Sequence, residues 1–144
     1  MPDGMTKGKI LAVDFGNTHV GLALSDVDRQ VAFPYMTMSY FCSLVKLFAK
    51  LKSICDQENV ALVVMGVPLG ENGLLTPQAE RIRAIGKKME DALGNIEVCF
   101  IDEAFSSFEA NQFLENIHIK ASRRKKTEDE VAAVLILRKY MDKK

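Results

Sequence analysis

The amino-acid sequence predicts an α/β protein in which helices flank a mixed sheet of five strands. Short apolar runs of strand length alternate with longer stretches whose apolar residues recur at helical spacing. Three strand-like runs come first and the later ones are separated by helices, an order that combines hairpins with crossovers. The chain has 144 residues, of which 48% are apolar, and this fits one globular domain.

The first three strands are expected near the N-terminus. The first strand is expected over residues 9–13, where an apolar run from Ile10 to Val13 is followed by a carboxylate, Asp14. Only a few residues separate it from the second strand, His19–Ser25. A connection this short predicts a hairpin. Residues 31–38 form the third strand, and Pro34 marks it as an edge or irregular strand, because proline cannot donate a hydrogen bond to a neighbour.

Helices and strands alternate in the middle of the chain. An amphipathic helix is expected over residues 41–59, and the most apolar run, Val60–Val67, follows as a central strand buried on both faces. Thr76 and Pro77 are typical of the start of a second helix, and Gly94 is typical of its end.

One strand and two helices are expected in the C-terminal part. Residues 96–101 form the fifth strand, and Ser106 begins a short helix through a capping box. A second capping box at Thr127 begins the last helix, so residues 117–126 are expected to form a loop. The resulting element order is that of the ribonuclease H-like fold, an analogy at the level of the fold alone.

Composition and charge exclude several classes of protein. Basic and acidic residues number 19 each, so the net charge is zero, which argues against a protein that coats nucleic acid without specificity. The three cysteines show no CxxC or Cys/His spacing and are typical of reduced thiols. We find no signal peptide and no apolar run near the ~20 residues of a membrane span. We therefore expect a cytoplasmic protein without membrane contact, with a flexible tail over residues 1–8 and a single domain over residues 9–144.

Three acidic positions are candidates for the chemistry. Asp14 ends the first strand, Asp102 and Glu103 end the fifth, and Asp129 lies in the first turn of the last helix. In open α/β sheets, sites form beyond the carboxyl ends of the strands. Clustered carboxylates repel one another unless a divalent cation lies between them, and Mg²⁺ prefers carboxylate and water oxygens. Two such ions about 4 Å apart can assist a phosphodiester displacement.

Each acidic position also has a purely structural explanation. Asp14 can accept N–H groups in the turn at Gly16. Asp102 and Glu103 can form an ordinary polar strand end, and Asp129 can stabilise the helix dipole. From the residues alone, the choice between Asp102 and Glu103 stays open.

Four segments together resemble one known family: DFGNTHVGLALSD, MGVPLGENGLLTPQAERIR, IDEAFSSFEA and KKTEDEVAAVLIL. Their order and spacing are similar to those of the YqgF family, also called RuvX, the Holliday junction resolvase-like or pre-16S rRNA nucleases. The resemblance extends from about Lys9 to Met141. It implies a ribonuclease H-like fold and a cytoplasmic bacterial protein that matures the 5′ end of small-subunit ribosomal RNA. Processing of DNA junctions has also been proposed for the family.

The resemblance also implies the site. The catalytic and metal-binding carboxylates of the family fall on Asp14, Glu103 and Asp129, with Mg²⁺ or Mn²⁺ as the cofactor. The implied partner is nucleic acid, either precursor rRNA or branched DNA, and a ribosomal precursor is a further candidate.

Three positions depart from the family pattern. Thr18 and His19 replace a basic pair after the Asp-x-Gly turn, and Ala104 replaces the arginine after the late-strand glutamate. Arginine binds phosphate through two parallel hydrogen bonds and alanine cannot. We therefore expect the affinity or choice of substrate to differ in this chain.

Two groups of basic residues remain, and we expect the loop over residues 117–126 to hold the nucleic-acid backbone beside the site. The expected loop carries most of them: Lys120, Arg123, Arg124, Lys125 and Lys126. A second group lies on the helix that begins near Thr76: Arg81, Arg83, Lys87 and Lys88. Neutralising the loop residues should weaken binding and flatten its salt dependence.

Three functions remain open on the sequence. The leading one is a Mg²⁺- or Mn²⁺-dependent endonuclease that processes pre-16S rRNA or resolves Holliday junctions. The second is a non-catalytic module that binds RNA or a ribosome precursor, in which Ala104 reflects lost activity. The third is an ATP-binding phosphotransferase, because Asp14-x-Gly16-x-Thr18 resembles the phosphate loop of the actin and sugar-kinase superfamily. Such proteins need two lobes, and this chain has room for one.

Overall fold

The computed structural model describes residues 8–16, 18–39, 43–68, 76–102 and 121–142, and for residues 121–129 it describes the backbone alone. The short helix expected from Ser106 and most of the expected N-terminal tail lie outside these ranges. In the described part of the chain, no helix is long and apolar enough to cross a membrane.

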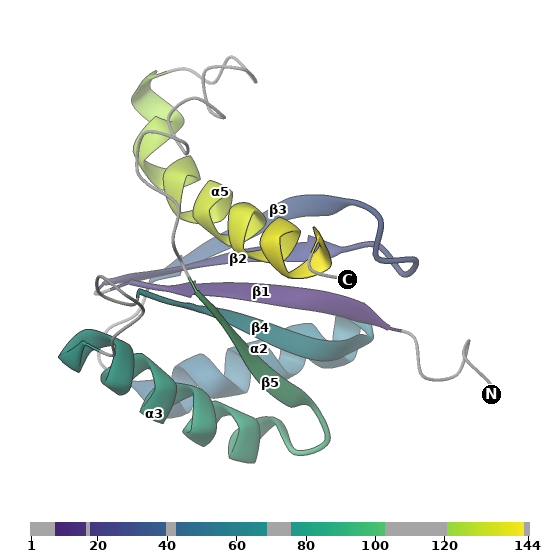
Figure 1. Ribbon diagram of the computed structural model, residues 1–144, viewed down its shortest axis with the longest axis vertical. Helices are drawn as coiled ribbons and strands as arrows, with labels where there is room; N and C mark the ends of the chain where they lie inside the picture. Colours follow the sequence, from purple (N-terminus) through teal and green to yellow (C-terminus); the bar gives the residue numbers. More distant parts are fainter. Residues whose placement is uncertain (1–7, 17, 40–42, 69–75, 103–120, 143–144) are drawn as a thin grey trace.

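Five strands form one mixed sheet in the order β3-β2-β1-β4-β5 (Figure 1). β1 pairs antiparallel with β2, and β2 antiparallel with β3, whereas β1 and β4, and then β4 and β5, are parallel. The strands are β1 (Lys9–Phe15), β2 (His19–Ser25), β3 (Ala32–Ser39), β4 (Val60–Val67) and β5 (Glu97–Asp102). The five strands and the mixed sheet expected from the sequence are thereby confirmed.

The β1–β2 hairpin carries β1 two residues further than expected. The antiparallel pairing continues to Phe15, which is opposite Val20, so Asp14 lies inside the strand and not just after it. The N–H of Gly16 donates to the carbonyl oxygen of His19 at 2.9 Å and closes the hairpin. A Cβ atom on Gly16 would lie 2.8 Å from that oxygen, so the turn requires glycine.

β3 is an edge strand, as Pro34 predicts. The pairing of β2 with β3 shifts register between Leu22 and Ala23, where Ala23 is opposite Pro34 and Leu22 is opposite Met36. The proline therefore lies at the irregular point of an edge strand, where a missing N–H is tolerated best.

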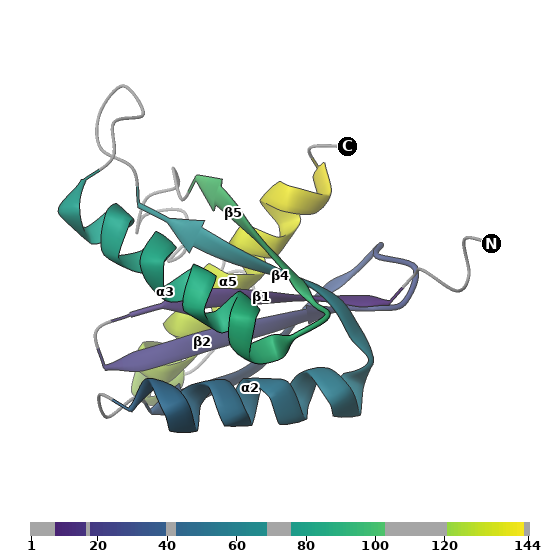
Figure 2. The ribbon, with the colours of Figure 1, turned by 90° about the horizontal axis from the view of Figure 1, so that it is seen from below.

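Helices cover both faces of the sheet. α2 (Leu44–Glu58) and α3 (Pro77–Leu93) lie on one face and α5 (Ala121–Asp142) lies on the other, as Figures 1 and 2 show. Thr76 caps the start of α3 by accepting the N–H of Ala79, and Gly94 ends the helix at φ 82°. These are the boundaries that the sequence predicts for α3.

The prediction of a loop over residues 117–126 is wrong for residues 121–126. α5 begins at Ala121, so Arg123 and Lys126 and the residues between them belong to the helix and precede the expected start at Thr127. Alanine, arginine and lysine are good helix formers, and no glycine or proline interrupts the stretch. The capping-box pattern at Thr127 therefore does not mark a helix start.

Alternate residues of β1 face two separate apolar cores. Leu11 and Val13 belong to the core under α2 and α3, whereas Ile10 and Ala12 belong to the core under α5. Because successive side chains of a strand point to opposite faces, Asp14 lies on the face that α5 covers.

Candidate functional site

Asp14 is the central described residue of the candidate site. It lies near the carboxyl end of β1, its side chain is half-buried, and it faces α5. The fold places a carboxylate there because β1 is otherwise a buried apolar strand: Ile10 to Val13 are fully buried. A carboxylate so close to the core requires polar or charged partners.

Glycines lie beside Asp14 on both neighbouring strands. Gly21 of β2 is directly opposite Asp14. On β4, Met65 is opposite Val13, so Gly66 is level with Asp14 one residue further along both strands. Glycine within a strand permits a ligand or another backbone to approach closely. Neither neighbouring strand therefore projects a side chain over Asp14 on the α5 face.

A hydrogen bond ties α5 to this row of the sheet. The hydroxyl of Thr37 on β3 donates to Oε2 of Glu130 on α5 at 3.0 Å. Thr37 is opposite Gly21, which is opposite Asp14, so the three residues form one row across β3, β2 and β1. Two strand spacings, about 9.6 Å, separate Thr37 from Asp14. Asp129 directly precedes Glu130, so this contact anchors the part of α5 that carries Asp129.

A second contact ties α5 to the end of β5. The ammonium group of Lys139 donates to the backbone carbonyl oxygen of Asp102 at 2.7 Å. Asp102 is the last residue of β5, and Glu103 follows it directly. α5 is thus held at β3 through Glu130 and at β5 through Lys139.

The alternation of β5 distinguishes Asp102 from its neighbour. Phe100 packs on the core under α2 and α3, and Ile101 belongs to the core under α5. Asp102 therefore continues on the α2 and α3 side, opposite to the face of Asp14. Its side chain is exposed, which fits a solvated strand end.

The other residues expected in the site are described only in part. Glu103 and Lys120 lie outside the described residues. Asp129 lies in α5 together with four expected basic residues, and only their backbone is described: Arg123, Arg124, Lys125 and Lys126. Among the described side chains, no three histidine, cysteine or acidic groups come together in a way that could hold a metal ion. Asp14 itself offers hard oxygen donors, which fit Mg²⁺ or Mn²⁺.

Among the described residues, the shifted pKa values of Glu58 and Cys55 belong to groups away from Asp14. The ammonium group of Lys9 and the hydroxyl of Tyr35 both bind the carboxylate of Glu58 and lower its pKa. Lys9 begins β1, whereas Asp14 lies near its other end. Burial raises the pKa of the Cys55 thiol to about 11, so this thiol is a neutral part of the core. These groups stabilise the fold, and none of them adds a titrating side chain beside Asp14.

Sequence reasoning missed four residues that lie beside Asp14 or hold α5 across its face of the sheet: Gly21, Thr37, Gly66 and Lys139. The two glycines could have been found from the sequence, because glycine inside an apolar strand indicates that a ligand or another backbone approaches closely there. Thr37 and Lys139 could not have been found in this way, since their hydrogen-bond partners are 93 and 37 residues away in the chain.

Comparison with known proteins adds a family and a fold. Residues 8–143 match the model of a family described as RuvX, Holliday junction resolvase. A protein of Malacoplasma penetrans is 32% identical over 141 residues, which cover 94% of this chain and 95% of that protein. A protein of Chloroflexus aurantiacus is 34% identical over 133 residues, which cover 92% and 86%. Both are described as candidate pre-16S rRNA nucleases.

Solved structures are similar in fold. RuvC of Thermus thermophilus in complex with a Holliday junction substrate aligns with a TM-score of 0.59 over 93% of both chains, at 14% identity. At this identity the likeness shows the fold alone. It confirms the ribonuclease H-like architecture that the order of elements predicts.

Proposed function

Since the chain belongs to the RuvX family, we propose that it is a metal-dependent nuclease that processes the 5′ end of pre-16S rRNA. The observation that supports this most is the position of Asp14. It is a half-buried carboxylate near the carboxyl end of β1, on the face where α5 is anchored beside it. Relatives described as candidate pre-16S rRNA nucleases support the substrate.

In this proposal Asp14, Glu103 and Asp129 hold Mg²⁺ or Mn²⁺. The ion, when bound, supplies positive charge to offset the negative charge that develops on the phosphodiester oxygens. Glu103 is preferred over Asp102 because Asp102 lies on the opposite face of β5. Thr37 and Lys139 keep α5 in place over the sheet.

The basic residues near the start of α5 hold the nucleic-acid backbone in this proposal. Because Arg123, Arg124, Lys125 and Lys126 are consecutive on a helix, their positions are spread around its axis at about 100° per residue. Only some of them can contact one strand at the same time. We therefore expect single substitutions of these four residues to weaken nucleic-acid binding by different amounts. In a loop, all four could contribute to binding.

A cleavage assay tests the proposed activity. The substrates are an RNA that carries the 5′ precursor segment of small-subunit rRNA and a four-way DNA junction, each with Mg²⁺, Mn²⁺ or EDTA. We expect the RNA to be cut with either metal and not with EDTA. Cleavage that persists in EDTA would contradict the proposal.

Holliday junction resolution is the second candidate, favoured by the description of the matching family. Metal-dependent cutting of the junction with the RNA left intact would support it. If both substrates bind and neither is cut, the chain is a non-catalytic binding module.

A further inference from the structure

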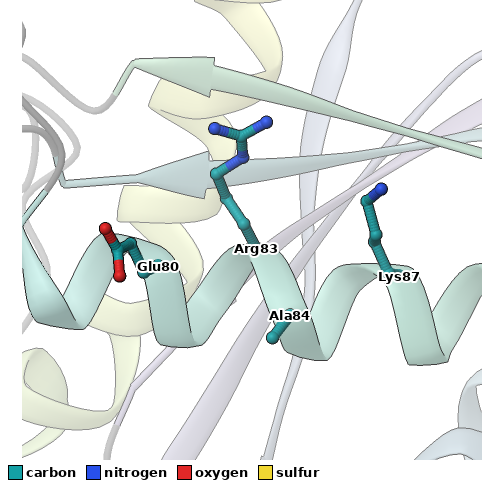
Figure 3. Close-up of a pocket in the computed structure, with 4 residues that line it drawn as sticks. All are labelled: Glu80, Arg83, Ala84 and Lys87. Atoms are coloured by element: carbon teal, nitrogen blue, oxygen red, sulfur yellow. The ribbon is translucent and has the colours of Figure 1, made fainter.

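An exposed stripe of α3 lines a pocket on the side of the sheet opposite to Asp14. The pocket measures about 290 Å³ and is lined by Glu80, Arg83, Ala84 and Lys87 (Figure 3). These residues are three, four and seven positions apart, so they lie on one face of the helix. Figure 3 shows the side chains of Arg83 and Lys87 extending from α3 toward the strands, with Glu80 one turn earlier.

Packing against β5 orients Arg83. Its guanidinium lies over the ring of Phe100, 5.7 Å from the ring centre. Phe100 is also close to Gly86 of α3, where an added Cβ atom would lie 2.6 Å from the ring. The ring therefore packs closely on α3 beside the guanidinium, and an arginine placed over an aromatic ring keeps its hydrogen-bond donors free for a ligand.

The two cations of this pocket are not neutralised by other described residues. The ion pairs between two described side chains are Lys9–Glu58 and Lys52–Asp56, and neither includes Arg83 or Lys87. Arg83, Ala84 and Lys87 are all exposed. Glu80 is the single acidic group in the lining, so the pocket keeps a net positive charge. Two unpaired cations over a small apolar floor are suited to a phosphate group.

The pocket lies near the end of the sheet that carries Asp14. Phe100 is opposite Met65, and Met65 is opposite Val13, the residue before Asp14. Two strand spacings, about 9.6 Å, separate Phe100 from Val13. A nucleic-acid strand that passes Asp14 and continues across the carboxyl end of β5 reaches α3.

We propose that Arg83 and Lys87 form a phosphate-binding site on α3 for the nucleic-acid strand flanking the cleavage position. The site rests on the proposed nuclease function and adds a contact on the α3 side of β5. Glu80 limits the site at the start of α3, because its carboxylate repels a phosphate there. Such a contact reads the backbone and contributes affinity without sequence preference.

Variants of the same helix test this site. Arg83→Gln and Lys87→Gln each remove one pocket cation. Arg81→Gln and Lys88→Gln each remove one cation from another side of the helix, about 100–160° around its axis from the pocket cations. Affinity for the RNA and for the DNA junction is measured at several salt concentrations in EDTA. The KM and kcat for cleavage are measured with Mg²⁺.

The pocket variants should weaken binding about 3- to 10-fold each and raise KM without changing kcat. The double variant should lower the slope of log affinity against log salt by about 1.4–1.8. Glu80→Gln should strengthen binding, because it removes a like charge. Arg81→Gln and Lys88→Gln should leave the slope within about 0.3 of the wild-type value.

Equal losses in the pocket and control variants would overturn the site, since they would reflect net charge alone. Unchanged binding in the pocket variants would also overturn it. A wild-type chain that neither binds nor cuts either substrate would instead contradict the proposed function. Comparison of the two substrates shows whether the flanking strand is RNA or DNA.

Discussion

The position of Asp14 depends on small neighbours. Gly21 and Gly66 are level with it on the adjoining strands, and both are buried. Any larger residue at either position would project a side chain onto the α5 face beside the carboxylate. These two glycines therefore keep the surroundings of Asp14 open to α5 and to a ligand.

Asp26 is a carboxylate with a structural role. It accepts the N–H of Val31 at 2.9 Å and the N–H of Gln30 at 2.8 Å, in the turn that joins β2 to β3. These two bonds hold the pKa of Asp26 below its usual value of 3.8. Because the folded-state pKa is lowered, the stabilisation is present above the unfolded-state pKa and is lost as pH falls through the folded value.

Replacing Asp26 with Asn should lower the free energy of unfolding at pH 7, because a charged acceptor binds these N–H groups more strongly than an amide oxygen. The difference from wild type should shrink as the pH falls through the lowered pKa of the wild-type carboxylate, where that group becomes protonated. Urea unfolding of both proteins between pH 7 and pH 2 measures this difference in the free energy of unfolding. Asp28→Asn in the same turn is the control. A difference in unfolding free energy that stays constant down to pH 2 would show that the charge of Asp26 does not stabilise the fold.

Gly86 is a second residue whose size matters. We expect Gly86→Ala to destabilise the protein by about 1 kcal/mol, although alanine is the better helix former by a similar amount. The new Cβ would lie 2.6 Å from the ring of Phe100 and 3.1 Å from the sulfur of Met65, and overpacking of this kind costs about 1–3 kcal/mol.

Thermal unfolding of the two single variants and the double variant Gly86→Ala/Phe100→Leu measures this coupling. The leucine should recover part of the loss in the Gly86→Ala background, because it removes the clashing ring. A Gly86→Ala variant more stable than wild type would mean that α3 can move away from β5.

At the scale of elements, boundaries were predictable where a residue has one physical role. Thr76, Pro77 and Gly94 delimit α3 as the sequence predicts, because a capping hydroxyl, a fixed φ and a C-terminal glycine are local signals. The start of α5 was not predictable, since residues 121–126 favour a helix as much as a solvated loop.

The anchoring of α5 was also beyond sequence reasoning. The bond from Thr37 to Glu130 joins residues 93 apart in the chain, and no periodic pattern encodes it. The candidate Asp14 was identified from its place after a buried strand, but the row that surrounds it depends on strand register. Register is a property of the assembled sheet.

Thr37→Val should reduce kcat about 10- to 100-fold and leave KM for the substrate unchanged. Valine keeps the shape of the side chain and its preference for strands but cannot bind Glu130, so α5 loses its anchor beside Asp14. Single-turnover cleavage and the Mg²⁺ concentration for half-maximal rate measure the effect. Thr37→Ser retains the hydroxyl and should restore both values.

Loss of this one hydrogen bond should lower stability by only about 1 kcal/mol. A fall in thermal stability with no change in kcat or in the Mg²⁺ requirement would make Thr37 a structural residue alone. Lys139→Met provides a parallel variant at the other end of α5, where the bond to the carbonyl of Asp102 is lost. Lys139→Arg is its matched control.

For the whole molecule, the topology brings distant segments to one end of the sheet. The central strands β1 and β4 are parallel and flanked by the β2–β3 hairpin on one side and by β5 on the other. The carboxyl ends of β1, β4 and β5 therefore lie together. α5 crosses the face of the sheet that carries Asp14, and α3 covers the opposite face (Figures 1 and 2). Asp14 and the Arg83 pocket thus lie on opposite faces near the same end.

The architecture was accessible from the sequence because each strand is a compact apolar run and each helix has a clear stripe. The face of the sheet on which each acidic residue lies could not be predicted from the sequence, because a shift of one residue in a strand moves a side chain to the other face. Asp102 illustrates this, since only the alternation of Phe100 and Ile101 shows that it lies on the side of α2 and α3.

The central claim is that the Asp14 carboxylate carries the nuclease activity, and its most direct test is single-turnover cleavage of the precursor RNA with Mg²⁺ by wild type, Asp14→Asn and Asp102→Asn. Asn is nearly isosteric with Asp and lacks its charge. We expect Asp14→Asn to lose at least about 100-fold in rate while RNA affinity and thermal stability stay close to wild type. Asp102→Asn should cut at nearly the wild-type rate, because its side chain lies on the other face and is solvated. Equal cleavage by Asp14→Asn and wild type would contradict the account.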